Sequence, residues 1–98
     1  MTVRLGINGF GRIGRLVVRG LRGRDDIELV HVNDPHCDVV TAAHLLDFDT
    51  VHGRFAGRVE SDGSVLTVDG TAATFSSLDT PAAVPWLEHG VDIVLECS

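Results

Sequence analysis

The 98-residue sequence has little of what marks several large classes of protein. Its two cysteines, Cys37 and Cys97, do not stand in Cys-x-x-Cys spacing, so neither a disulfide scaffold nor a structural zinc site is expected. No apolar run approaches the length of a membrane span, and Met1 leads directly into a predicted strand instead of a signal peptide. We therefore expect a cytoplasmic protein without a membrane partner.

Positive charge is scarce and of one chemical kind. The eight basic residues are all arginine, against 14 acidic residues, and the net charge is −6. A nucleic-acid partner is therefore not expected. Arg12, Arg15, Arg19 and Arg22 recur at helical spacing, and we interpret them as one solvated face of a helix. Binding of RNA or a protein to this face is the alternative.

A glycine-rich stretch near the amino terminus organises the chain. An alternating strand pattern over residues 3–7 leads into Gly9, Gly11 and Gly14, which have Gly-x-Gly-x-x-Gly spacing. The first glycine permits a tight turn, the second lets the backbone approach a pyrophosphate, and the third lets the following helix pack closely on the strand. Free N–H groups at the start of that helix then face the phosphates. The spacing predicts a dinucleotide site.

The segment after this motif adds the second part of such a site. A helix is expected over residues 11–22, with an apolar stripe of Ile13, Leu16, Val17 and Leu21. A second strand is expected over 27–32, parallel to the first. Asp34 follows that strand, about 20 residues beyond Gly14, where a carboxylate can accept hydrogen bonds from ribose hydroxyls and repel a 2′-phosphate. NAD is therefore expected over NADP. Asp38 is the better cap for the next helix, which leaves Asp34 free for the ligand.

The remainder of the chain predicts a mixed fold. We expect a helix over 39–46, a loop over 47–54, and an antiparallel meander with short strands near Val59, 65–68 and 72–75. Asp62-Gly63 and Asp69-Gly70 mark its two turns. A short helix should run from Thr80 to Leu87 and close at Gly90, followed by a buried strand over 91–96. The fold class is α/β: a Rossmann-type doubly wound parallel sheet, in its first and incomplete part, with an inserted antiparallel β-meander.

Histidines and acidic residues suggest no metal site. His44, Asp47, Asp49 and His52 are dense in the sequence, but no pattern places them on one face, and we expect no metal. The other histidines, His31, His36 and His89, are isolated in sequence and are expected to be hydrogen-bonded or solvated, not catalytic.

Five blocks of sequence together resemble the amino-terminal part of a phosphorylating glyceraldehyde-3-phosphate dehydrogenase. In order they are INGFGRIGR (7–15), VNDP (32–35), AHLL (43–46), DTVHGRF (49–55) and DIVLECS (92–98). The resemblance implies that residues 1–98 are an incomplete NAD-binding domain and that the catalytic domain is not in this chain. By the same resemblance, NAD is the cofactor and the parent protein is a homotetramer that takes a phosphorylated aldehyde and inorganic phosphate.

The resemblance also implies a set of coenzyme-binding residues. It suggests backbone contacts to the pyrophosphate from Arg12 and Ile13, ribose contacts from Asp34, and a backbone contact near the adenine from Leu78, where Arg or Lys is usual. Ser98 stands where the family brings a small hydroxyl residue towards the nicotinamide ribose. The complete predicted set is Asn8, Gly9, Phe10, Gly11, Arg12, Ile13, Asn33, Asp34, Pro35, Leu78, Cys97 and Ser98.

The chemistry that the resemblance implies needs residues from outside this chain. The family uses a cysteine thiolate that attacks the aldehyde, a histidine that activates it, and hydride transfer to NAD. Neither catalytic residue is expected among these 98, and the chain alone should be inactive, since Cys97 ends a strand outside the family's nucleophile motif. Phe48 stands where most glycolytic members carry tyrosine, so relatives associated with erythrose 4-phosphate or organoarsenicals remain alternatives. A non-catalytic NAD-binding regulatory module is the other alternative.

Overall fold

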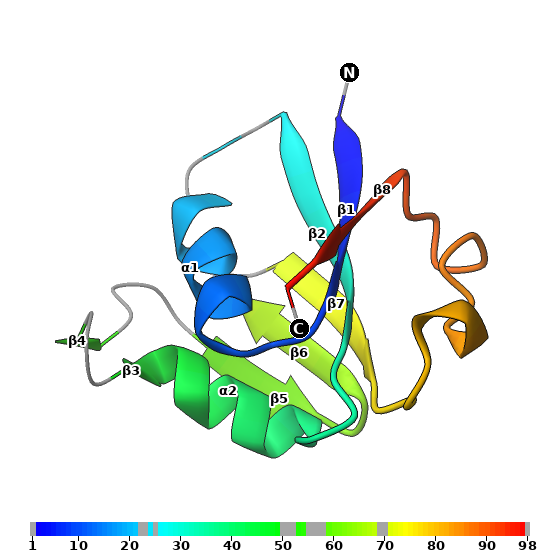
Figure 1. Cartoon of the computed structure of the whole chain (residues 1–98). Helices are drawn as coiled ribbons and strands as arrows, with labels where there is room; N and C mark the ends of the chain where they lie inside the picture. Colours follow the sequence, from blue (N-terminus) through cyan, green and yellow to red (C-terminus); the bar gives the residue numbers. More distant parts are fainter. Residues whose placement is uncertain are drawn as a thin grey trace.

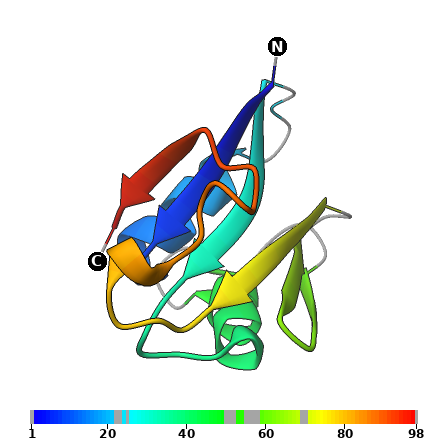
Figure 2. The same cartoon turned by 90° about the vertical axis from the view of Figure 1, so that its right-hand side faces the viewer.

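A mixed β-sheet is the centre of the fold. The computed structural model describes residues 2–21, 24, 26–49, 53–54, 59–68 and 71–97. Within these residues six strands form one sheet in the order β5-β6-β7-β2-β1-β8 (Figure 1). Adjacent pairs among β1 (Val3–Asn8), β2 (Ile27–Asn33), β7 (Thr71–Ser76) and β8 (Ile93–Glu96) are parallel. Their arrows point the same way in Figure 2, so their carboxyl ends meet at one edge.

The meander is present as predicted and extends the parallel sheet. β5 (Val59–Asp62) pairs antiparallel with β6 (Val65–Val68), which pairs antiparallel with β7. Gly63 turns between the first two strands with a positive φ of 61°. The second predicted turn, Asp69-Gly70, lies outside the described residues. In the predicted loop over 47–54, β3 (Phe48–Asp49) pairs with β4 (Gly53–Arg54), and the residues between them lie outside the described part.

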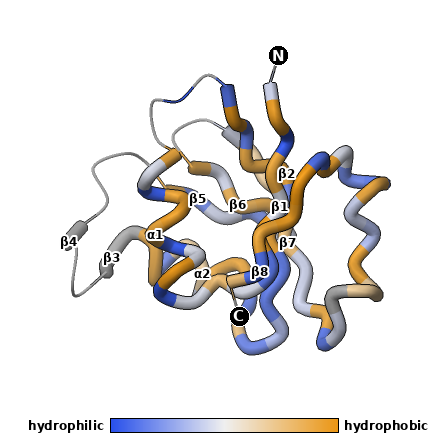
Figure 3. The backbone as a smooth tube through the Cα atoms, turned by 45° about the horizontal axis from the view of Figure 1, so that its top comes forward, coloured by the Kyte–Doolittle hydropathy of each residue, from blue (hydrophilic) through white to orange (hydrophobic). Residues whose placement is uncertain are grey.

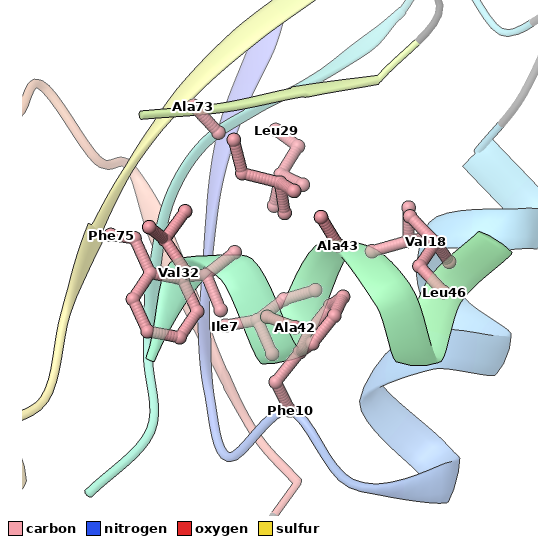
Figure 4. Packing of buried hydrophobic residues seen from close by; sticks show 12 residues of the cluster. Ile7, Phe10, Val18, Leu29, Val32, Ala42, Ala43, Leu46, Ala73 and Phe75 are labelled. Atoms are coloured by element: carbon pink, nitrogen blue, oxygen red, sulfur yellow. The ribbon is translucent and has the colours of Figure 1, made fainter. Parts of the chain in front are cut away.

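Two helices cover one face of this sheet. α1 (Arg12–Leu21) packs on β2, and α2 (Val39–Asp47) packs on β5 and β6. Figure 4 shows apolar side chains gathered between them and the sheet. This core consists of Ile7, Phe10, Val18, Leu29, Val32, Val39, Ala42, Ala43, Leu46, Leu66, Ala73 and Phe75. Within the described chain, neither helix has the length and apolar character needed to cross a bilayer.

The buried face of α1 agrees with the predicted stripe only in part. Val17 and Leu21 pack against the core as predicted. Gly14 and Val18 are the buried residues, whereas Ile13 is 58% exposed and Leu16 is 36% exposed. The helix therefore rolls towards its glycine, because the closest approach to the strand is possible only where no side chain intervenes.

The segment after β7 covers the opposite face of the sheet. The path of this segment is seen in Figure 1. It contains a short 3-10 helix, η1 (Pro81–Ala83), followed by a series of turns that ends at Gly90, which has a φ of 74°. The predicted helix from Thr80 to Leu87 is therefore wrong. Pro85 is the reason, since it has no N–H to donate and its ring clashes with the carbonyl of the preceding turn.

β8 is an edge strand and not the buried strand that its sequence predicts. It pairs with β1 and is the last strand of the six-stranded sheet. β8 is coloured as hydrophobic in Figure 3. Its Ile93 is nevertheless 50% exposed and its Val94 is 39% exposed. An apolar run shows that a strand can be buried on both faces, but the packing of neighbouring elements decides whether it is.

Candidate functional site

The glycine motif forms the connection between β1 and α1. Gly9 has a φ of 96°, which permits the tight turn, and its N–H donates to the carbonyl of Asn33 at 2.7 Å. A Cβ added to Gly14 would lie 2.5 Å from the carbonyl oxygen of Gly9, so this glycine lets α1 pack on the turn. A Cβ added to Gly11 would meet nothing within 4 Å. The backbone at Gly11 therefore borders open space.

Asp34 fastens this turn to the end of β2. Its carboxylate is buried and accepts the N–H of Phe10 at 2.7 Å through Oδ2 and the N–H of His36 at 2.7 Å through Oδ1. The carboxylate is thus engaged by the backbone, which corrects the expectation that it is free. Each oxygen still has a second lone pair for a ligand hydroxyl. Asp38 caps α2 as predicted, with the N–H of Thr41 donating to Oδ1 at 2.8 Å.

A row of polar side chains ties together the carboxyl ends of the four parallel strands. Asn8 pairs in register with Asn33 and Glu96, and Asn33 pairs in register with Ser76. The Asn8 amide donates to Glu96 Oε2 at 2.9 Å and accepts from Asn33 Nδ2 at 2.9 Å. The Ser76 hydroxyl donates to Asn33 Oδ1 at 2.6 Å. We call these four residues the polar row. The polar row holds together the edge of the sheet at which the turn between β1 and α1, called the glycine turn below, lies.

A cavity of about 500 Å³ opens at this edge. The cavity lies at the end of β1, which is the strand at which the order switches. β1 has β2, the next strand in the chain, on one side and β8, the last strand, on the other. Such a switch in strand order is the usual place for a ligand in an open α/β sheet. The cavity is lined by Asn8, Gly9, Gly11, Asp34, Pro35, His36, Asp79 and Cys97.

The predicted coenzyme residues divide into two groups around this cavity. Six of them line it: Asn8, Gly9, Gly11, Asp34, Pro35 and Cys97. Phe10 is instead 1% exposed in the core, and Arg12 and Ile13 form the exposed start of α1. Ser98 lies outside the described residues.

Asn33 and Leu78 lie beside the cavity and hold each other. Asn33 Nδ2 donates to the carbonyl of Leu78 at 3.0 Å, and its Oδ1 accepts the N–H of Leu78 at 2.9 Å. The predicted contacts of these residues with the coenzyme stay predictions. Their shared hydrogen bonds position the segment that carries Asp79 to the cavity wall.

Sequence reasoning missed two residues of the cavity wall, His36 and Asp79. Each directly follows a residue of the predicted set, Pro35 and Leu78, but no residue-type pattern marked either of them. Their position next to a predicted contact was the one feature of the sequence that could have indicated His36 and Asp79.

Neither thiol of the chain is prepared to act as a nucleophile. Burial, with the carboxylates of Asp34 and Asp38 nearby, raises the pKa of the Cys37 thiol to about 11. Burial and the neighbouring Glu96 also raise the pKa of the Cys97 thiol. Because the thiolate is the reactive form, both cysteines are protonated and unreactive near neutral pH.

The arrangement fits a dinucleotide. The first N–H groups of α1 have no acceptor within the helix and follow directly on Gly11, where the backbone is open to the cavity. Asp34 stands one strand away as a hydrogen-bond acceptor on the same wall. Backbone donors for a diphosphate and a carboxylate for a sugar are thus present around one cavity.

Comparison with known proteins agrees with this geometry. A family model described as "Glyceraldehyde 3-phosphate dehydrogenase, NAD binding domain" matches residues 3–98. The chain is 51% identical over its whole length to glyceraldehyde-3-phosphate dehydrogenase 3 of Nostoc sp. and covers 29% of that protein. It is 49% identical over 98% of its length to glyceraldehyde-3-phosphate dehydrogenase of Neurospora crassa, covering 28% of it. For the Pseudomonas aeruginosa enzyme the identity is 48% over the whole chain, which covers 30% of it.

The chain thus spans less than a third of these relatives. It belongs to the glyceraldehyde-3-phosphate dehydrogenase family, in the part that forms the NAD-binding domain.

Proposed function

We propose that this chain holds NAD in the cavity at the carboxyl ends of β1 and β2, as the coenzyme-binding portion of a phosphorylating glyceraldehyde-3-phosphate dehydrogenase. The observation that carries the proposal is that Gly11, where a Cβ would meet nothing within 4 Å, lines the same cavity as Asp34.

The residues of the cavity divide the work of binding. The N–H groups of Arg12 and Ile13 bind the pyrophosphate, because the start of α1 combines free donors with the positive end of the helix dipole. Asp34 accepts from the adenosine ribose while its two backbone bonds hold it in place. A 2′-phosphate would meet the carboxylates of both Asp34 and Asp79, so NAD is preferred over NADP.

The reaction itself is assigned to residues beyond this chain. When bound, NAD supplies the hydride acceptor for oxidation of the aldehyde. The nucleophilic cysteine and the histidine base are proposed to lie in the parent protein's catalytic domain, with a phosphorylated aldehyde and inorganic phosphate as substrates. The protonated thiols of Cys37 and Cys97 support this division, and the chain alone should not turn over. A homotetramer is inferred from the family resemblance, and a cytoplasmic location from the sequence features given above.

Calorimetric titration with NAD and NADP tests the binding proposal. We expect Gly11→Val to weaken NAD binding by more than about tenfold, because its side chain enters the space meant for the pyrophosphate. Gly20→Val is the matched control, since a Cβ at that exposed position of α1 also meets nothing within 4 Å but lies away from the cavity. Asp34→Ala should weaken NAD by roughly 1–3 kcal/mol.

Two results would contradict the proposal. One is equal affinity of the unmodified chain for NAD and NADP, which would remove the role of Asp34. The other is unchanged NAD affinity in Gly11→Val. Because Asp34 also holds the turn, thermal unfolding of Asp34→Ala must be measured beside its binding.

A further inference from the structure

A cluster of polar and aromatic side chains lies on the sheet face opposite the helices. We call residues 77–92, between β7 and β8, the covering segment. The ring of His31 on β2 stacks on the ring of His89 in this segment, with centroids 4.0 Å apart and an angle of 9° between the ring planes. Trp86 meets His31 edge-on at 5.3 Å. His31 bonds Thr74 Oγ1 at 2.6 Å and Ser76 Oγ at 2.9 Å. His31 is hydrogen-bonded as predicted, and the two histidines, which are isolated in sequence, meet in space. We call these five residues the histidine cluster.

The hydrogen bonds fix the protonation of His31. Because the backbone N–H and carbonyl of Leu78 set the orientation of the Asn33 amide, the Ser76 hydroxyl donates to Asn33 Oδ1. Ser76 Oγ therefore accepts from His31, which carries its proton on Nε2. His31 Nδ1 then accepts from the Thr74 hydroxyl. The neutral Nε2–H form of His31 is thus the one that the surrounding donors and acceptors fit.

His89 completes this chain of hydrogen bonds. Its Nδ1 lies 3.3 Å from Thr74 Oγ1 and donates to it, because the Thr74 proton points to His31. One continuous direction of donation runs from His89 through Thr74, His31 and Ser76 to Asn33. It joins the covering segment to the polar row and to the backbone of Leu78 beside the cavity.

We propose that the stacked His31 and His89 form an acid-sensitive latch, which fastens the segment containing Trp86 to the sheet while His31 is neutral and releases it when both imidazoles are charged.

The surroundings of His31 oppose a positive charge. His31 is 1% exposed, and its neighbours are the hydroxyls of Thr74 and Ser76 from β7 and the rings of His89 and Trp86 from the covering segment. Among the described residues, the titratable group that acts electrostatically on it is His89, which would repel it when charged. Burial, with His89 as the second cause, lowers the pKa of His31 to about 4.

Charge on one ring and charge on both rings have different effects. A charge on His89 alone leaves its Nδ1–H bond to Thr74 in place, above a neutral His31. When His31 also carries a proton on Nδ1, the Thr74 hydroxyl turns away to the carbonyl of Val30 at 3.3 Å, and two cations stack at 4.0 Å. Two charges at that distance strongly repel in a buried setting. Charge on both rings therefore opens the latch.

Release should be visible at Trp86. A Cβ at Gly6 would lie 2.8 Å from Trp86 Cζ3, so the indole packs directly on the bare backbone of β1. Trp86 is the single tryptophan of the 98 residues, and its fluorescence therefore reports on this segment. The test needs no nucleotide, so failure of the latch and failure of the proposed NAD binding are distinguishable.

The experiment is an acid titration of the chain from about pH 8 to about pH 3.5, followed by Trp86 fluorescence and far-ultraviolet circular dichroism. We expect the emission to shift to longer wavelength with a midpoint between about pH 4 and pH 6, before the circular dichroism changes. His89→Phe keeps an aromatic ring on His31 without a second charge and should lower that midpoint by about one pH unit. His44→Phe, at an exposed position of α2, should leave it unchanged.

Equal midpoints in the parent chain and in His89→Phe would overturn the latch, as would a Trp86 signal that changes only when the whole chain unfolds. A measurement on the unaltered chain guards against a variant that does not fold. Imidazole ¹⁵N spectra at neutral pH should show His31 protonated on Nε2; protonation on Nδ1 would contradict the chain of donation on which the latch depends.

Discussion

Asn33 shows how one buried side chain can define the edge of a site. Its amide nitrogen donates to Asn8 and to the carbonyl of Leu78, and its oxygen accepts from Ser76 and from the N–H of Leu78. With 0% exposure, its four hydrogen-bonding positions are all filled by protein. Its side chain therefore acts on the cavity by holding the segment beside it, which is a positioning role.

Replacing this amide should be costly. We expect Asn33→Ala to lower the free energy of unfolding by about 3 kcal/mol, because it removes four hydrogen bonds, two with the backbone of Leu78 and one each with Asn8 and Ser76. Urea denaturation measures the loss. Ser77→Ala is the control, since that exposed hydroxyl makes one bond, to the carbonyl of Cys37, and should cost less than about 1 kcal/mol. Similar losses in the two variants would mean that the amide does not have this bracing role.

At the scale of the element, a glycine decides which apolar side chains of α1 pack on the sheet. Ile13 and Leu16 are 58% and 36% exposed, whereas Gly14 lies against the carbonyl of Gly9 and Val18 is buried. Helical periodicity identified the helix, but several faces of α1 carry apolar residues. Contact with the glycine turn selected the face on which Gly14 and Val18 stand one above the other.

Two alanine substitutions in α1 should therefore have opposite effects. Gly14→Ala would bring a Cβ to 2.5 Å from backbone, and we expect it to destabilise the fold by about 2 kcal/mol. Gly20→Ala meets nothing within 4 Å, so its higher helix propensity should stabilise the fold by about 0.5–1 kcal/mol. Thermal or urea unfolding of both variants gives the comparison. A neutral Gly14→Ala would show that the close approach is not required.

At the scale of the whole molecule, the two faces of the sheet differ in chemistry. The face under α1 and α2 is apolar, as Figure 4 shows, whereas the opposite face carries the polar row and the histidine cluster. Hydrogen bonds and stacked rings fasten the covering segment there, and these respond to pH in a way that apolar packing does not.

Stability should consequently fall in mild acid. His31 has a pKa of about 4 in the folded chain and about 6.5 when unfolded, so between these values the unfolded chain binds more protons. The contribution of His31 is complete above about pH 6.5 and is lost as the pH falls towards 4, on the order of 3 kcal/mol in total. Urea denaturation at several pH values in this window measures it.

The acidic residues act in a different pH window. A hydrogen bond from Arg24 holds the pKa of Asp26 below its usual value, and the N–H of Thr41 does the same for Asp38. Their contributions are present above about pH 4 and are lost only below it. A flatter profile in His31→Gln would therefore identify His31 as the source of the loss at higher pH. An equally steep profile would exclude it.

Local patterns in the sequence were enough to predict much of the framework. The glycine spacing, the alternating strand before it and the position of Asp34 indicated the dinucleotide site, and the Asp-Gly pairs indicated the meander. These features were readable because backbone geometry makes local demands on residue type: a positive φ at Gly9 and Gly63 favours glycine.

Contacts between distant segments were decided only by the tertiary structure. The stack of His31 on His89, the place of Asp79 in the cavity wall and the engagement of Asp34 by Phe10 all depend on strands that pair far apart in sequence. Exposure of Ile93 depends likewise on which strands flank β8. The sequence by itself determined the turns, the strand pattern and the kind of ligand, because these follow from local geometry. Packing determined what each side chain touches, because that depends on which elements meet in space.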